Sequence, residues 1–516
     1  MKKTAFAIMF ITVASKILGF VREIALSYIY GASTITDAYL ISLTIPGVVF
    51  SFIGAGLGTG FIPMYSRIKE EQGVVAANRF TNNIINGTLL FSSIFVLMGL
   101  IFARPLVRIF ASGFGGEAQE ITIQFTRISI FAIYFTGLAG IYSGYLRLHD
   151  SHLVPNLTGI PMNVIIILSV FISSKTTVYA LLLGTLLARA LEVLLMAPFA
   201  KKKGFQYEPV LDLRDENLRS MVAIALPVIV GVSVNQINVL VDRTLASQIA
   251  VGGISALNYA SRLNGFIQGL FVLPVSSVMY PMISSMASRQ NLGGLKNMLT
   301  DAIGIINLMV TPATIGAIIF AEPIVELLFG QGAFTSEASA MTSSALRFYS
   351  IGMLAIGIRE ILTRAFYALQ DTKIPMQSGV IAVGINVVLN VILARFLGIG
   401  GLALATSIAN VVATVHLLLA LARSIGEFGL REIAIPLGKV VLASTAMGFI
   451  ALATYRYVGV TLSHSLSLAA AIGVGALSYF ILIYFLSVPE AERAFEAVKR
   501  LFRGKKGESR GRNHHR

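Results

Sequence analysis

The chain has 516 residues, of which 55% are hydrophobic and only 13% are charged, and its mean hydropathy is +0.79. Soluble proteins carry about 25% charged residues, so this composition excludes an ordinary soluble protein and indicates one that crosses a membrane many times. The formal net charge of +15 raises nucleic acid as a partner, but the chain lacks stacking aromatics and binding motifs, so no nucleic acid is expected.

Apolar windows of about 20 residues recur along nearly the whole chain, and each is long enough to cross about 30 Å of hydrocarbon. They predict an all-α polytopic membrane protein. The absence of cysteine excludes disulfides and thiolate chemistry. The fourteen expected spans are 4–30, 36–66, 79–103, 123–148, 153–174, 176–200, 217–249, 253–287, 296–321, 337–368, 374–396, 400–424, 432–456 and 463–487.

The first two expected spans contain Lys16, Arg22, Glu23 and Asp37, and the eighth contains Arg262. An ionised side chain in a bilayer costs at least about 2.5–3.5 kcal/mol, so it faces a partner or a watery cavity. Arg22 and Glu23 point about 100° apart on a helix, so we do not expect them to neutralise each other. The excess of cations predicts an anionic ligand, because the arginine fork grips phosphate. The alternative is that these charges form structural ion pairs that lock two halves of the protein together.

A second polar group occurs in the later spans. Asn386 and Asn390 share one helix face at i,i+4, Thr406 lies on the next span, and Asp242 lies on the seventh. Such oxygen ligands suit Na⁺, and the carboxylate could instead carry H⁺. Transport coupled to Na⁺, H⁺ or the membrane potential is therefore expected, without another cofactor. In the alternative interpretation, the asparagines bond between helices and Asp242 pairs with Arg243.

The remaining charges in the spans suggest ion pairs within the helix bundle, to which we assign no role. They fall into two groups, Arg189 with Glu192 and Arg359 with Glu360 and Arg364. Enzyme motifs are missing: there is no P-loop, no HExxH and no GxSxG sequence. We therefore expect a protein that is not an enzyme.

The chain contains an internal repeat. The segment FARPLVRIF at 102–110 reappears as FAEPIVELLF at 320–329, and FIPMYS at 61–66 is echoed by MYPMIS at 279–284. Two copies of six spans in one orientation, around a central cavity, are typical of transporters. The expected domains are an N-terminal lobe (1–200), a cytoplasmic linker (201–216), a C-terminal lobe (217–425), two further helices (426–487) and a basic cytoplasmic tail (488–516).

The distribution of Lys and Arg predicts the orientation. If the spans alternate, most cations outside them fall on one side, including Lys2, Lys3 and the run Lys201-Lys202-Lys203. The positive-inside rule makes this side cytoplasmic, with both termini in the cytoplasm. The basic tail is expected to lie near anionic membrane lipids.

Four segments carry a resemblance to a known family. They are SKILGFVREIALSYIYGASTITDAYLISLTIPGVVFSFIGAGLGTGFIP at 15–63, YASRLNGFIQGL at 259–270, LLFGQGAFT at 327–335 and FYALQDTKIP at 366–375. Together they resemble the MurJ/MviN family of lipid II flippases along essentially the whole chain. The resemblance implies the fold of the multidrug/oligosaccharidyl-lipid/polysaccharide exporter (MOP) superfamily, with two lobes around a V-shaped cavity and two C-terminal helices beside a lipid-tail groove.

The resemblance also implies a function in peptidoglycan biosynthesis, cell wall biogenesis and cell shape. The substrate would be undecaprenyl-pyrophosphate carrying a disaccharide-pentapeptide, flipped by alternating access from the inner to the outer leaflet of the bacterial cytoplasmic (plasma) membrane. Cell-wall synthesis and division proteins would be further partners.

Individual residues match the family motifs. Lys16 matches a family Arg, Arg22 the Arg after LGF, Asp37 the acid of TDA, and Arg262 the Arg of YA-x-R, so these four are expected to bind substrate. Glu23 and Ser51 are expected to support the cavity. The family typically carries an Arg-Arg or Arg-Lys pair and then Glu-Gly after the span-2 proline, where this chain has Phe50-Ser51 and Ala55-Gly56.

Three alternatives stay open. The chain could flip another polyprenyl-linked glycan, such as a teichoic, capsular or spore precursor, or it could be a cation-coupled exporter of the same superfamily. From a different class, it could be a non-transporting scaffold for envelope assembly. A scaffold would not need Lys16, Arg22 and Arg262 in the bilayer.

Overall fold

The computed structural model describes residues 2–426 and 430–492, and within these ranges the chain forms α-helices and two short π-helices without any β-strand. The prediction of an all-α membrane protein is confirmed. Most of the predicted basic tail, residues 493–516, lies outside the described residues. The helices group into two compact units, and each is described by itself.

The first unit contains the chain up to Tyr259 together with Leu328–Met341. Its helices are α1 (Lys2–Tyr30), α2 (Thr34–Gly56), the π-helix η1 (Leu57–Phe61), α3 (Ile62–Ile101), α4 (Ala103–Phe110), α5 (Gly116–Ser129), α6 (Ala132–Leu148), α7 (Leu153–Leu157), α8 (Gly159–Ser173), α9 (Tyr179–Lys202) and α10 (Glu216–Ile249).

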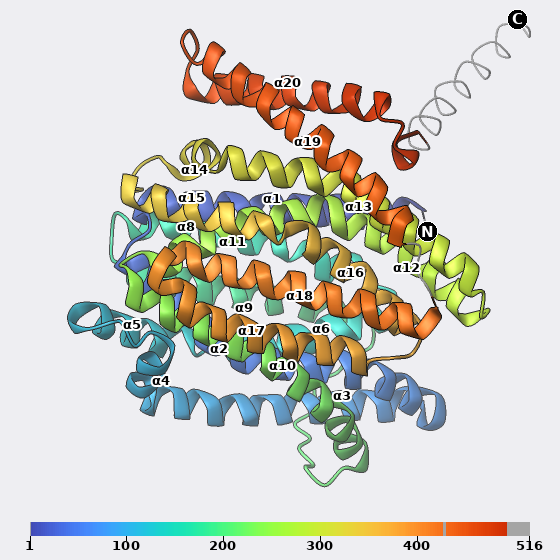
Figure 1. Cartoon of the computed structure of the whole chain (residues 1–516). Helices are drawn as coiled ribbons and strands as arrows, with labels where there is room; N and C mark the ends of the chain where they lie inside the picture. The colour runs from blue at the N-terminus through green and yellow to red at the C-terminus, as the bar shows by residue number, and fades with distance from the viewer. Residues whose placement is uncertain (1, 427–429, 493–516) are drawn as a thin grey trace, which may run out of the picture. The chain divides into compact units, whose positions relative to one another are not determined.

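The second unit contains Ala260–Leu327 and the chain from Thr342 onward. Its helices are the π-helix η2 (Gln268–Val272), α12 (Leu273–Ser288), α13 (Leu292–Ile319), α16 (Met353–Ala368), α17 (Lys373–Leu397), α18 (Ile399–Ile425), α19 (Leu430–Val458) and α20 (His464–Phe485). Figure 1 shows α17 beside α18 and α19 beside α20. Three helices contribute residues to both units, namely α11 (Gly253–Ile267), α14 (Ala321–Phe329) and α15 (Ser336–Ile351).

Among the described residues, 11 segments are long and apolar enough to cross a membrane. One of them, Thr34–Ile101, covers two expected spans, and its helix α3 is interrupted at Gly73 by a non-helical backbone with φ of 85°. The 11 segments do not include α1, which carries three charged residues in its second half, or α15 and α16, which have 16 residues each. The expected count of fourteen is therefore not confirmed and stays a prediction.

The repeat is visible in local structure. Two long helices, α3 and α13, stop at phenylalanines with nearly the same backbone angles, Phe102 (φ −97°, ψ 18°) and Phe320 (φ −102°, ψ 22°), and a short helix follows each. Both π-helices are followed two residues later by a proline, Pro63 or Pro274. The π-helices thus pair Pro63 with Pro274, whereas the sequence echo pairs it with Pro281.

The helix α10 packs on α2, η1 and α3, which explains why the first helix of the expected C-terminal lobe belongs to the first unit. It begins at Asp215, whose carboxylate accepts the N–H of Leu218 at 2.9 Å, a typical N-cap. The lobe boundaries at 1–200 and 217–425 stay a prediction.

The segment that precedes α10 is attached to α3 by a row of asparagines. Asn78, Asn82 and Asn86 lie four residues apart and therefore on one helix face, with Asn83 beside them. We call residues 203–212 the linker strap, because these amides bind its backbone carbonyls. The pairs are Asn78 with Gly204 at 3.1 Å, Asn82 with Gln206 at 2.9 Å, Asn83 with Asp212 at 2.8 Å, and Asn86 with Glu208 at 3.1 Å and Val210 at 2.9 Å.

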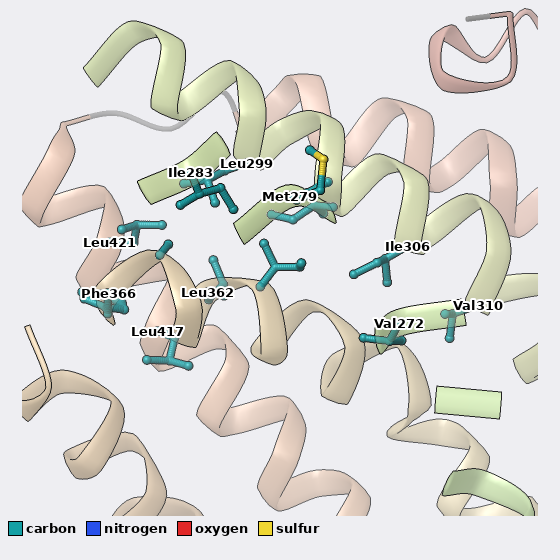
Figure 2. Close-up of a cluster of buried hydrophobic side chains, with 14 of the residues drawn as sticks. Val272, Met279, Ile283, Leu299, Ile306, Val310, Leu362, Phe366, Leu417 and Leu421 are labelled. Carbon is teal, nitrogen blue, oxygen red and sulfur yellow. The ribbon is translucent and has the colours of Figure 1, made fainter. Parts of the chain in front are cut away.

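The second unit has a continuous apolar core formed by α12, α13, α16 and α18 with η2 (Figure 2). Its side chains, such as Ile283, Ile306, Leu362 and Leu417, are fully buried. This core fixes α16 against α13 and α18, and so positions the polar side chains that these helices carry.

Candidate functional site

Arg22 and Glu23 form an ion pair, so the prediction that they do not neutralise each other is wrong. Arg22 Nη2 lies 2.7 Å from Glu23 Oε1, and the Glu23 side chain is only 4% exposed. The 100° rotation between neighbouring residues separates their Cβ atoms, but the flexible arginine side chain reaches back across that angle. The attraction between the two opposite charges offsets part of the free energy that is needed to remove each of them from water.

Two asparagines that the sequence interpretation did not assign to the site hold this pair in place. Asn163 of α8 accepts from Arg22 Nη1 at 3.3 Å, and Asn258 of α11 donates to Glu23 Oε2 at 3.1 Å. The signal available in the sequence was an amide side chain within each apolar span, but other amides occur in the same spans. With both contacts made, the Arg22 side chain is still 23% exposed and keeps N–H donors for a ligand.

Asp37 is fully buried and binds the beginning of α11. Its Oδ2 accepts the Gly252 N–H at 2.8 Å, and its Oδ1 accepts the N–H and the hydroxyl of Ser255 at 2.8 and 2.7 Å. A carboxylate at a helix N-terminus is also stabilised by the helix dipole. Both oxygens are therefore used within the first unit, and direct contact of Asp37 with substrate stays a prediction.

The other expected binding residues lie in different settings. Lys16 is exposed on α1, and Arg262 is exposed on α11 in the second unit. Ser51 of α2 donates its hydroxyl to Val48 O of its own helix at 2.6 Å. Its role as cavity support stays a prediction.

The structure brings together three of the four residues expected to bind a cation. Asn390 donates to Asn386 Oδ1 at 2.7 Å, and Asn386 of α17 donates to Thr406 Oγ1 of α18 at 3.0 Å. The second bond joins two helices, as the alternative interpretation expects, whereas the first lies within α17. Asp242 belongs to the first unit, and these three residues belong to the second. In the described part of the chain no three His, Cys, Asp or Glu side chains are grouped to hold a metal, so a Na⁺ site here would consist mainly of neutral oxygens.

Two of the expected bundle ion pairs are present, and one residue is differently placed. Arg189 lies 3.2 Å from Glu192, and Arg364 lies 2.8 Å from Glu360. The expectation that Arg359 shares this second pair is wrong, because its Nη1 donates instead to Asn410 Oδ1 of α18 at 2.9 Å.

Comparison with known proteins gives consistent matches. The family model described as "Lipid II flippase MurJ" matches residues 26–486. A probable lipid II flippase MurJ of Bdellovibrio bacteriovorus is 28% identical over 95% of this chain and 96% of its own length. That of Treponema pallidum is 28% identical over 82% of each chain.

Solved structures give the same match at the level of the fold. A lipid II flippase MurJ in an inward closed conformation is 27% identical, with a TM-score of 0.81 over 93% of this chain and 98% of that protein. An inward-facing multidrug resistance MATE transporter of the MOP superfamily is 17% identical, with a TM-score of 0.69 over 82% of this chain and 98% of that chain, and shows the fold alone.

Proposed function

The chain belongs to the family of the lipid II flippase MurJ, and from that premise we propose how its own residues carry lipid II from the inner to the outer leaflet. It is a multi-pass membrane transporter, not an enzyme, and its substrate is a lipid-linked precursor of peptidoglycan. The work of such a protein is to shelter a charged headgroup from hydrocarbon while the lipid tail stays in the bilayer.

The observation that supports the proposal is that the Arg22 guanidinium is held in place and is still partly exposed. Glu23 and Asn163 fix its guanidinium in one orientation, while 23% of the side chain remains exposed. A pre-oriented guanidinium binds phosphate with little loss of side-chain entropy, and it does so through two parallel hydrogen bonds. Lys16, on the same helix, is proposed to add charge for the same pyrophosphate, and phosphate binding by Arg262 stays a prediction.

Asp37 has a different part in the proposal. Its bonds to Gly252 and Ser255 join α2 to the first turn of α11, so they are suited to hold one side of the transporter closed. Alternating access would require these three hydrogen bonds to break and form again in each cycle. In the orientation that the positive-inside rule favours, both termini lie in the cytoplasm, and the contacts of Asp37 close the outer side of the transporter.

Coupling to Na⁺ is proposed at Asn386, Asn390 and Thr406 of the second unit, and a contribution of Asp242 of the first unit stays a prediction. The amide and hydroxyl oxygens of the first three lie in one hydrogen-bonded group, which supports a weak site for a hard cation. H⁺ carried by Asp242 and direct use of the membrane potential are the alternatives. The bacterial cytoplasmic membrane as location and cell-wall synthesis and division proteins as partners stay predictions.

The first experiment replaces Arg22 or Arg262 by Ala in a bacterium depleted of its own lipid II flippase. Each change removes phosphate contacts worth roughly 1.5–3 kcal/mol per charged hydrogen bond, so we expect the intact chain to restore outer-leaflet lipid II and both variants to fail. Arg22→Lys should restore part of the transport, because an ammonium cannot form the fork. Arg67→Ala, which breaks an exposed pair with Glu71, is the control and should transport normally.

The melting temperature of the same purified variants separates binding from structure. If Arg22 only balances Glu23, Arg22→Ala should lower the melting temperature, and adding Glu23→Gln should restore both stability and transport. That rescue would refute a substrate contact. Failure of the intact chain with lipid II, combined with rescue of another glycan pathway, would favour a different polyprenyl-linked substrate, which the Phe50-Ser51 and Ala55-Gly56 departures also suggest.

A further inference from the structure

Arg359 differs from the ion-paired arginines of the membrane helices. Arg22, Arg189 and Arg364 each lie within 3.2 Å of a carboxylate. Among the side chains that the structure describes, Arg359 forms no ion pair, and its single hydrogen bond goes to the neutral amide oxygen of Asn410 at 2.9 Å. The charge of Arg359 is therefore left without a counter-charge inside the second unit.

A cation in such a helix faces a partner or a watery cavity, because burying it alone is too costly. A guanidinium has five N–H donors, and one amide oxygen satisfies only one of them. The remaining donors favour an oxyanion, and phosphate oxygens match the spacing of the arginine fork.

The surroundings of Arg359 hold its guanidinium and leave room beside it. Asn410 donates its own amide to Thr406 O at 2.8 Å, so its Oδ1 is turned toward Arg359. On the neighbouring helix α17, Gly379 has no side chain to cover the guanidinium: a Cβ there would already be in van der Waals contact, 3.9 Å from Arg359 Nη2, and a larger side chain would block it. Arg359 and Gly379 are both half-buried, so a ligand can approach.

We propose that Arg359, oriented by Asn410 and given space by Gly379, binds the phosphate oxyanion of a lipid. The site lies entirely in the second unit, formed by α16, α17 and α18. The inference rests on the proposed function for its biological source, which is either the pyrophosphate of the transported lipid or the phosphodiester of a bilayer phospholipid. The chemistry of recognition is the same for both.

The experiment measures lipid binding to the full purified chain by native mass spectrometry, with undecaprenyl-pyrophosphate and phosphatidylglycerol as separate probes. We expect Arg359→Gln to weaken the binding of undecaprenyl-pyrophosphate about tenfold or more, since the substitution removes charged hydrogen bonds to the phosphate. Arg359→Lys should retain part of the affinity. Arg364→Gln is the matched control, five residues further along the same helix and paired with Glu360, and should bind both probes normally.

A second variant keeps the test valid if Arg359→Gln does not fold. Gly379→Leu leaves the charge in place and fills the space beside Nη2, so it should also weaken binding. Loss of phosphatidylglycerol alone would support the site and assign it to bilayer lipid. Normal binding of both probes by folded Arg359→Gln and Gly379→Leu would overturn the proposal, and a fall in melting temperature with unchanged binding would make Arg359 a structural residue.

The two proposals fail in different ways. If Arg22→Ala loses the pyrophosphate lipid while Arg359→Gln binds both probes normally, only the Arg359 site is refuted. If Arg359→Gln loses a lipid while Arg22→Ala binds and transports normally, the Arg359 site stands and the Arg22 contact is refuted.

Discussion

At the scale of single residues, the buried charges are stabilised by groups from helices far away in the sequence. Asp37 accepts three hydrogen bonds from Gly252 and Ser255, and Glu23 is held by Arg22 and Asn258. Because these acceptors and donors are enclosed, replacing one leaves another unsatisfied, and the loss is larger than on a surface.

Asp37→Asn tests this directly. The amide would turn a donor toward the N–H of Gly252 or Ser255, so one or two charged hydrogen bonds are lost, and we expect the free energy of unfolding to fall by roughly 2–3 kcal/mol. The measurement is the melting temperature of the purified variant. The control is Asp371→Asn, since Asp371 also accepts backbone N–H groups, those of Lys373 and Ile374, but is only half-buried, whereas Asp37 is fully buried. Equal effects of the two substitutions would contradict the role of burial.

How far the sequence predicts this site depends on the residue. The family motifs and the cost of membrane charges single out Arg22, Glu23 and Asp37, but helix rotation alone mispredicts the Arg22–Glu23 contact. Rotation fixes the direction of Cβ, whereas the end of an arginine is placed by rotatable bonds and by amides on other helices. Asn163 and Asn258 could not be identified as those amides without the packing of α8 and α11.

At the scale of elements, the linker strap behaves as part of α3. Asparagine side chains of α3 bind the backbone carbonyls of the strap, as a neighbouring strand would in a β-sheet. Phe205 of the strap is only 4% exposed, and its ring lies 5.8 Å from that of Tyr142 and 5.2 Å from that of Tyr145. The sequence predicts a polar cytoplasmic linker at 201–216. The four-residue spacing of Asn78, Asn82 and Asn86 was a signal for its attachment, but only the structure shows what those amides bind.

The double variant Asn83→Ala/Asn86→Ala should release the strap. It removes three hydrogen bonds to strap carbonyls, and we expect a loss of roughly 1–3 kcal/mol of stability, with faster trypsin cleavage after Lys203 and Arg214. The rate of cleavage is the measurement. Asn156→Ala serves as control, because Asn156 makes no bond to the strap and donates within its own helical turn, to His152 O at 2.7 Å. Unchanged cleavage in the double variant would show that Asn78, Asn82 and Phe205 hold the strap without Asn83 and Asn86.

At the scale of the whole molecule, the duplication that the sequence indicates recurs in the Phe102 and Phe320 helix breaks and in the two π-helices. The compact units divide the chain at Tyr259 and not in the linker. A sequence repeat reflects duplication of a segment of the chain, whereas a compact unit reflects which helices pack together. The two boundaries differ because α10 packs with helices of the first copy.

Energy coupling is a property of the whole transporter and tests the proposed cation site. Moving one charge through 100 mV is worth about 2.3 kcal/mol, so a Na⁺-coupled flippase should slow when the sodium gradient or the membrane potential is collapsed. Asp242→Asn and Asn390→Ala should each slow flipping in vesicles even when both gradients are intact, because the variants can no longer use them. Flipping that continues unchanged in both variants, with the gradients collapsed, would remove these residues from the mechanism.

The contact of Asp37 with Gly252 and Ser255 also has a consequence for biosynthesis. Its partners lie 215 and 218 residues further along the chain, and at about 5–20 residues per second a ribosome needs roughly 10–40 s to reach them. During that interval α2 is already made, while the donors that satisfy its carboxylate do not yet exist. The Leu328–Met341 segment that completes the first unit follows later still. The nascent chain therefore depends on water, lipid headgroups or the insertion machinery to shelter Asp37 until α11 is synthesised.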